Sequence, residues 1–136
     1  MQLQTIIDTP EIFIGHDLDN QWLYADWKGA YNQEGSRAAC LLMLEALRNS
    51  PCQKVLNDNS NITQAEMRFT GWGVLWWLEE MRTAGLLFLA WVLPKDLLAR
   101  QVAETTVHSI EQPRVGTFDD VASAYGWLQQ QEVHLN

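Results

Sequence analysis

The sequence predicts an α/β fold: a single-layer mixed sheet of about five strands, with an N-terminal antiparallel hairpin and about four helices. The N-terminal part is rich in β-branched and aromatic residues around a turn-forming segment, which is typical of a hairpin. Strand-like and helix-like segments then alternate to the end of the chain. Leu86–Leu93 is apolar at every position, which is typical of a parallel strand buried on both faces. The 136 residues fit a single domain, residues 1–136.

The hairpin is predicted from segments that flank a turn. Leu3–Ile7 and Ile12–Ile14 form either one interrupted strand or two short strands, because a Thr-Pro pair separates them. Gly15–Gln21 is rich in Gly, Asp and Asn and indicates the turn. Trp22–Trp27 is the antiparallel partner strand. Its alternation places Trp22, Tyr24 and Asp26 on one face and Leu23, Ala25 and Trp27 on the other.

A helix follows the hairpin. The polar segment Gly29–Gly35 predicts a connection. From Ser36 onward the apolar residues recur at three- and four-residue steps, which indicates a helix. The helix ends at Asn49-Ser50-Pro51, because proline cannot continue it. A short strand is then predicted from Lys54 to Leu56 or Asn57.

Asn57–Asn61 is a run of short polar residues, which we call the polar segment. We expect a tight turn here, at the carboxyl end of a buried strand, where ligands of open α/β sheets usually bind. Thr63 and Glu66 have the spacing of a capping box, so we expect the next helix to begin there. That helix should run to about Ala84, with Gly85 in a left-handed conformation after it.

The C-terminal part is predicted to continue the alternation. After the strand in Leu86–Leu93, Pro94 opens a helix at about Lys95–Thr106. Residues 107–110 fit either a strand or a helix. A strand at Val115–Phe118 and a helix at Asp120–Gln130, capped by Asp119 or Thr117, complete the chain.

Composition excludes several classes of function. The formal net charge of −8 lacks the basic footprint of a nucleic-acid-binding protein, and an anionic membrane surface would repel it. The longest apolar run, Ala84–Leu93, is too short for stable membrane insertion. Cys40 and Cys52 lack paired spacing, and the first fifteen residues hold no Lys or Arg. We therefore expect reduced thiols and a cytoplasmic location.

The polar segment is the first candidate site. Asn57, Asp58 and Asn59 can hydrogen-bond a ligand, or they can bond their own backbone, as such residues do in turns. Asp58 is also a candidate acid or base. Ser60 would lie near the positive end of the following helix, where a phosphate is favoured.

The second predicted helix carries more aromatic residues than one buried face needs. Phe69, Trp72 and Trp76 fall on the side away from the sheet, and Trp77 lies on the flank. Two interpretations are open. Either a loop or the third helix covers these rings, or the rings form a surface that binds a second copy of the chain, another protein or an apolar ligand. We expect a homodimer through this face.

Signals for catalysis and metal binding are missing from the sequence. No His, Cys or carboxylate pair has metal-ligand spacing, so we expect no metal and no cofactor. Glu79 and Glu80 are adjacent in a helix and do not converge on one substrate atom. Gly71-Trp72-Gly73 lies inside a helix pattern and is not a phosphate loop. We therefore assign no catalytic residue.

Several segments resemble a family of bacterial proteins. These segments are Trp22–Trp27, Val55–Asn61, Ala84–Leu86 with Ala90–Val92, and Phe118–Asp120 with Ala124, Tyr125, Trp127 and Leu128. They are similar to uncharacterised STAS-like, anti-sigma-factor-antagonist-like α/β domains, and the resemblance covers almost the whole chain. It implies a mixed sheet with helices, a cytoplasmic location and no established enzyme function. It also implies a phosphorylatable Ser or Thr near Ser60 or Thr63, although the family's Asp-Ser-Ser-Gly motif is absent.

Three hypotheses follow for function. The first is a non-catalytic protein-interaction or regulatory module that associates with itself, or with another protein, through the Trp-rich helix. The second is a protein that binds a small apolar ligand or a lipid in a pocket between that helix and the polar segment. The third is an enzyme that uses Asp58 as its acid or base.

Overall fold

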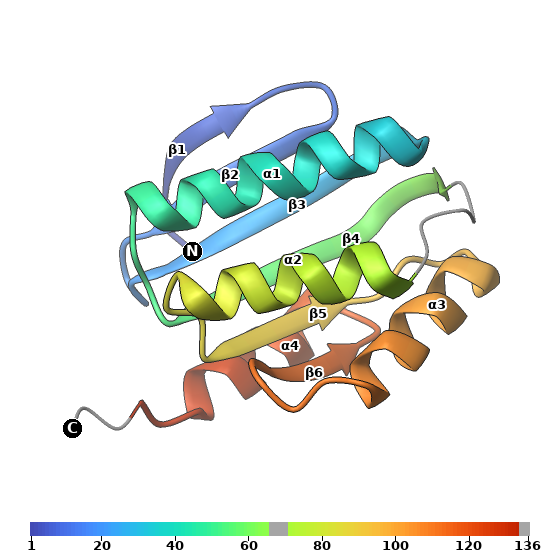
Figure 1. The fold of residues 1–136 in the computed structure, drawn as a ribbon. Coiled ribbons are helices and arrows are strands. Elements are labelled where there is room, and N and C mark those ends of the chain that lie inside the picture. Colours follow the sequence, from blue (N-terminus) through green and yellow to red (C-terminus); the bar gives the residue numbers. More distant parts are fainter. Residues whose placement is uncertain (66–70, 134–136) are drawn as a thin grey trace.

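The computed structural model describes residues 1–65 and 71–133 of the chain. The strands are β1 (Leu3–Asp8), β2 (Ile12–Asp17), β3 (Trp22–Tyr31), β4 (Lys54–Ala65), β5 (Phe88–Val92) and β6 (Arg114–Phe118). The helices are α1 (Gln33–Asn49), α2 (Gly71–Thr83), α3 (Leu97–His108) and α4 (Val121–Gln130). One six-stranded sheet forms, and its spatial order follows the chain order from β1 to β6 (Figure 1). The first three strands pair antiparallel and β3 to β6 pair parallel, which confirms the mixed sheet with an N-terminal hairpin.

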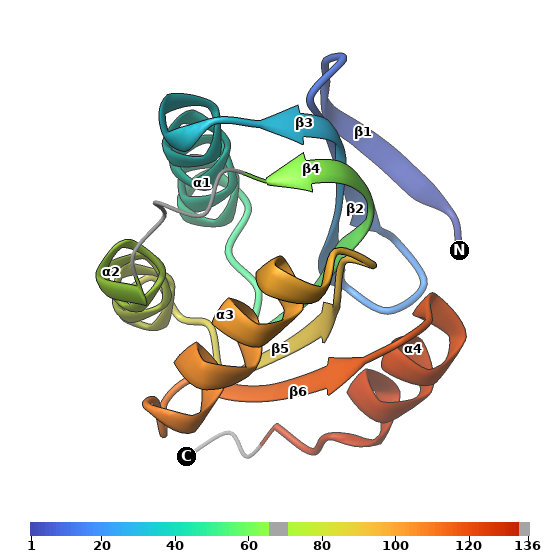
Figure 2. The same ribbon diagram turned by 90° about the vertical axis from the view of Figure 1, so that its right-hand side faces the viewer.

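Helices cover both faces of this sheet. Figure 2 shows α1 and α2 on one side and α4 on the other. The larger core lies on the face of α1, α2 and α3, and a smaller core around Trp22 and Leu56 lies beneath α4. Among the described residues α4 packs mainly on β4, β5 and β6, so most of that face over β1 to β3 has no helix on it.

The strand count is six instead of about five, because residues 3–17 form two strands joined by a turn. The interrupted pattern around Thr9 and Pro10 allowed either arrangement. The central strand β5 is buried on both faces and pairs parallel with β4 and β6, as its unbroken apolar run predicts.

The predicted polar connection at residues 29–35 is wrong. β3 continues to Tyr31, whose backbone lies opposite Ala65 of β4, and α1 begins at Gln33 after the cap residue Asn32. Gly29 has a φ of +81°, a conformation that favours glycine, beside an irregularity in the pairing of the two strands. This polar segment therefore forms the end of β3, which pairs with β4, and the cap of α1.

The predicted turn in the polar segment is also wrong, because β4 runs through it to Ala65. The register against β3 passes from Asp26–Asp58 to Lys28–Asn61, so β4 holds one extra residue there and forms a bulge. The expected capping box does not start a helix: Thr63 lies within β4, α2 begins at Gly71, and Glu66 lies outside the described residues.

The remaining elements follow the predictions closely. α2 ends at Thr83 and Gly85 has a φ of +115°. α3 begins at Leu97 after its cap residue Asp96, so Pro94 precedes the helix and does not open it as predicted. The helix includes Val107 and His108, which settles half of the ambiguous segment. The predicted caps of the last helix, Asp119 and Thr117, are wrong: Asp120 caps α4 through a hydrogen bond from the backbone N–H of Ser123. No helix in the described ranges is long and apolar enough to cross a membrane.

Candidate functional site

The polar segment contributes to both faces of the sheet, because successive side chains of a strand point to opposite sides. Asn57 faces the side of α1, α2 and α3, where it bonds Trp27. Asp58 faces the other side, where it bonds Tyr24. The residues predicted as one site therefore belong to two sites, which we call the cavity and the polar cluster.

The cavity lies between the sheet and the first three helices and has a volume of about 110 Å³. Apolar atoms make up most of its wall. Strands β3, β4 and β5 contribute Trp27, Tyr31, Asn57, Asn59, Ile62 and Trp91, and Pro94 follows β5. The helices contribute Ser36 and Cys40 from α1, Val74 and Trp77 from α2, and Ala99, Val102 and Ala103 from α3. The cavity thus lies toward the carboxyl ends of parallel strands, where such sheets usually bind ligands.

One end of the cavity is polar. The indole N–H of Trp27 donates to Oδ1 of Asn57 over 2.7 Å, and both side chains are buried. Nδ2 of Asn57 donates to Oδ1 of Asn59 over 3.4 Å, which is a long bond. The cavity therefore combines an aromatic body with a few fixed polar atoms, which is the usual composition of a small-molecule site.

Two titratable groups in the wall stay uncharged. Burial raises the pKa of the Cys40 thiol to about 12, so the thiolate is negligible at neutral pH. Burial also raises the pKa of Tyr31 to about 12. The Tyr31 hydroxyl donates to the backbone oxygen of Glu11, which fixes the ring at the edge of the cavity. Nucleophilic chemistry by either group is disfavoured at neutral pH.

The polar cluster lies on the opposite face and centres on Asp58. Oδ2 of Asp58 accepts from the Tyr24 hydroxyl over 3.0 Å. Its Oδ1 accepts from the backbone N–H of Ser60 over 2.9 Å and from the Ser60 hydroxyl over 2.6 Å. These bonds join Asp58 to Ser60 within the bulge of β4. Side chains of this kind make the same local bonds in turns, which is why the sequence suggested a turn here.

Asp26 is the second carboxylate of the polar cluster. It lies directly opposite Asp58 on the neighbouring strand, and it accepts from Nδ2 of Asn61 over 2.9 Å. Burial raises the pKa of Asp26 above its ordinary value. The hydrogen bond from Asn61 lowers this pKa, and the negative charge of Asp58 raises it. Burial and the two carboxylates also raise the pKa of Tyr24 far above its usual range. Asp26 and Tyr24 thus hold their protons more tightly than free side chains do.

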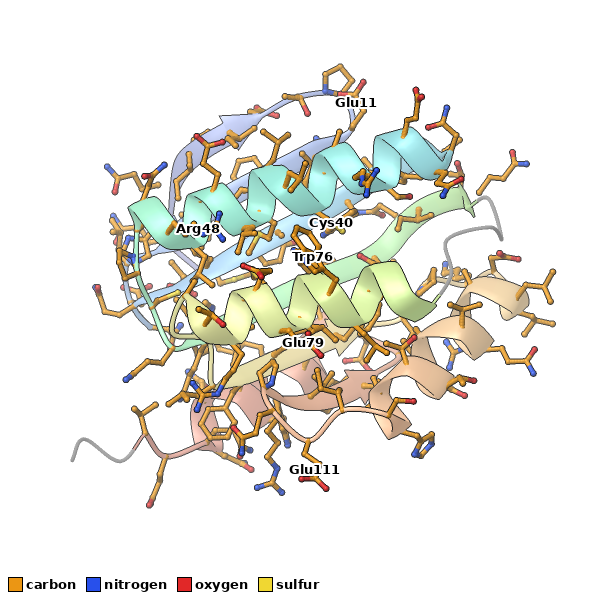
Figure 3. The ribbon with its side chains drawn as sticks, in the orientation of Figure 1. Glu11, Cys40, Arg48, Trp76, Glu79 and Glu111 are labelled. Carbon is orange, nitrogen blue, oxygen red and sulfur yellow. The ribbon has the colours of Figure 1, made fainter. Side chains whose placement is uncertain are left out.

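The aromatic residues predicted on α2 are placed differently from one another. Trp77 is buried in the core and lines the cavity, so its expected position on the flank becomes part of the inner face. Trp76 is 40% exposed, and Figure 3 shows it directed toward α1. Phe69 and the side chain of Trp72 lie outside what the structure describes. Of the two predicted α2 tryptophans whose side chains the structure describes, Trp76 is exposed and Trp77 is buried.

The geometry changes the argument for phosphorylation. Ser60 lies in the bulge of β4, far along the chain from the start of α2 at Gly71, so no helix N-terminus is placed beside it by sequence proximity. Its hydroxyl bonds Asp58, whose negative charge would repel a phosphate. Thr63 is exposed on β4. Modification of Ser60 or Thr63 stays a prediction.

Three aromatic residues of the cavity were missed at the sequence level: Trp27, Tyr31 and Trp91. The alternation of β3 placed Trp27 on the same face as Leu23, and that face carries the larger core. Trp91 belongs to the strand predicted to be buried on both faces. These signals locate both rings in the core but give no sign that a cavity lies between them. Across the described ranges, no group of three or more His, Cys, Asp and Glu side chains could hold a metal ion.

Comparison with known proteins gives the fold its class. No family model and no curated protein matches the chain. A solved structure, an uncharacterised protein of the DUF3478 family with a SpoIIAA-like fold from Shewanella loihica PV-4, is similar with a TM-score of 0.57. The match covers 90% of this chain and 98% of that protein at 17% sequence identity. The chain therefore has a SpoIIAA-like, or STAS-like, fold, as the resemblance implies.

Proposed function

We propose that this protein binds a small, mainly apolar molecule in the cavity. The observation that supports this function is the cavity itself, which has a volume of about 110 Å³ and lies between the sheet and three helices. Three tryptophans from different elements, Trp27, Trp77 and Trp91, line it. Asn57 supplies fixed polar atoms at one end.

The volume limits the size of the ligand. A dry protein cavity of about 150 Å³ holds a benzene molecule, whereas drug-sized ligands occupy about 300–1,000 Å³. The cavity of about 110 Å³ is smaller than either, so it fits at most a single ring, a short acyl chain or the end of a longer molecule. The wall holds no described residue positioned to break a bond in such a molecule, which favours binding without chemistry.

Tryptophan fluorescence tests this function. Titration with small aromatic and short-chain compounds should quench or shift the emission, because three of the indoles line the cavity. Ala99→Phe adds a ring to a half-buried position in the wall and should abolish the change. Ala122→Phe makes the same substitution at an exposed position of α4 and should leave binding intact. An unchanged response in the Ala99 variant would overturn the proposal.

A second candidate is self-association through the outer surface of α1 and α2. Its basis is the exposure of Trp76 at 40% and of Leu41 on α1 at 46%. Arg48 and Glu80 form an ion pair of 3.1 Å that links the two helices on this surface. Large exposed apolar residues are typical of protein interfaces.

Sedimentation tests the second candidate. The native protein should form a dimer, and Trp76→Asp should be a monomer, because a carboxylate in an apolar interface is strongly disfavoured. Leu97→Asp, at a position that is 79% exposed on α3, serves as the matched control and should remain a dimer. A monomer for the native protein and for both variants would count against self-association.

A further inference from the structure

The polar end of the cavity has a fixed direction. An indole N–H can only donate, so the atom of Asn57 that faces Trp27 must be its oxygen. The amide nitrogen of Asn57 then faces Asn59, which takes one of its two N–H groups over 3.4 Å. Trp27 thereby orients Asn57 so that its hydrogen-bond donors, and not its acceptor, are turned away from the indole.

The polar end of the cavity has N–H donors that bond no acceptor among the described residues. The second N–H of Asn57 bonds no acceptor among the described residues, although Asn57 is only 1% exposed. The amide nitrogen of Asn59 likewise has no acceptor in the described part of the chain. A buried donor without a partner costs about 1–3 kcal/mol. Asn57 is buried and Asn59 is half-buried, so an acceptor from a ligand would be stabilising mainly at Asn57.

The cavity wall also contains indole N–H donors. The indole nitrogens of Trp77 and Trp91 are buried and bond no acceptor among the described residues. Trp22, on the other face of the sheet, shares this property. The inference therefore rests on the amides of Asn57 and Asn59.

The cavity disfavours a ligand that carries either a negative or a positive charge. The cavity wall contains no charged side chain among the described residues. A buried carboxylate without a cationic partner is costly, and the net charge of −8 also repels anions. A cation could lie against the tryptophan faces, but the unused N–H donors of Asn57 and Asn59 would oppose it.

We infer that the cavity selects an uncharged ligand that carries a hydrogen-bond acceptor, such as a ketone, ester or amide oxygen, on a single ring or short alkyl body. This inference rests on the proposed function. The acceptor lies against the amide nitrogens of Asn57 and Asn59, and the apolar body lies among Trp27, Trp77 and Trp91. One such hydrogen bond should strengthen binding by about threefold to tenfold over an apolar compound of the same size.

Calorimetric titration with four compounds of similar size tests this ligand class. Acetophenone carries a neutral acceptor, ethylbenzene has none, benzoate is an anion and benzylammonium is a cation. Acetophenone should bind most tightly, followed by ethylbenzene, with both ions weakest. Equal affinity for acetophenone and ethylbenzene would overturn the inference while leaving the proposed function in place, as would tightest binding of either ion. Absence of binding by all four would overturn the proposed function itself.

Two variants connect the preference to the amides. Asn57→Leu has a similar volume and no donor, so it should bind ethylbenzene as well as or better than acetophenone. Asn59→Leu tests the same point at a half-buried position, where the fold tolerates a change more easily. Asn20→Leu removes an amide remote from the cavity and should keep the native order. An unchanged order in both cavity variants would overturn the assignment to Asn57 and Asn59.

Discussion

The indole N–H of Trp27 donates to Oδ1 of Asn57 over 2.7 Å, between two buried side chains of neighbouring parallel strands. Asn57 lies opposite Ala25 in the register, so Trp27 reaches it from two residues further along β3. This bond satisfies the donor of one residue and the acceptor of the other. It also orients the amide at the polar end of the cavity.

A double-mutant cycle should detect this bond. Trp27→Phe removes the donor and leaves Oδ1 of Asn57 unpaired, so we expect a loss of about 2 kcal/mol or more in the free energy of unfolding. Asn57→Leu leaves the indole N–H unpaired and should be destabilising by a similar mechanism. The double variant should lose about 1 kcal/mol less than the sum of the two, as measured by urea unfolding. Strict additivity would show that the two side chains are not coupled.

The burial of Asp26, together with the charge of Asp58 opposite it, predicts a pH dependence of stability. Because the pKa of Asp26 is raised in the folded protein, the unfolded chain releases this proton first as the pH rises. The native protein therefore loses stability between the ordinary Asp pKa of 3.8 and the raised folded value, and does not regain it at neutral pH. Asp26→Asn keeps the oxygen that accepts from Asn61 and removes this loss.

At pH 7 the Asp26→Asn variant should be more stable than the native protein by roughly 0.2–1 kcal/mol, the range for like charges on directly opposite strand positions. Below pH 3.8 the two proteins should unfold at the same urea concentration, because Asp26 is then protonated in both states. Asp8→Asn, which removes an exposed carboxylate at the sheet edge, provides a control. A stability difference that grows toward low pH would contradict this account.

Hydrophobic periodicity predicted most of the architecture from the sequence alone. The unbroken apolar run around Leu89 and Trp91 identified the central parallel strand, and the helix ends at Pro51 and Gly85 were readable because those residues act locally. Capping residues near Phe118 indicated the last helix, although its cap is Asp120 and not the predicted Asp119 or Thr117. Signals that depend on one residue and its near neighbours were therefore sufficient for the fold class.

The bulge in β4 could not be predicted in this way. Asp58 bonds the backbone N–H of Ser60 in this extended strand, and the same residues make the same kind of bond in a tight turn. The difference comes from pairing with Asp26 and Lys28, more than thirty residues earlier in the chain. Local sequence does not report such pairing. For the same reason Asn57 and Asp58 were placed in one site, whereas strand geometry separates them onto two faces.

Two glycines should respond to alanine in opposite directions. Gly85 has a φ of +115°, which a side chain rarely adopts, so Gly85→Ala should destabilise the protein by about 1–3 kcal/mol. Gly126 lies inside α4, and a Cβ there would meet no atom within 4 Å, so Gly126→Ala should stabilise it by about 0.5–1 kcal/mol. Thermal unfolding measures both. A stabilised Gly85 variant would show that the left-handed helix end is not required.

Cys40 should report directly on the cavity. Burial raises its pKa from 9.0 to about 12, so its thiolate fraction near pH 8 should be about a thousandfold lower than that of a free thiol. In a Cys52→Ala background, labelling by a disulfide reagent should be slower by at least this factor in the folded protein and fast in urea. A bound ligand should slow it further, and Ala122→Phe should not change it. Rapid labelling of folded protein would mean that the wall around Cys40 opens readily to water, which would contradict a preformed apolar cavity.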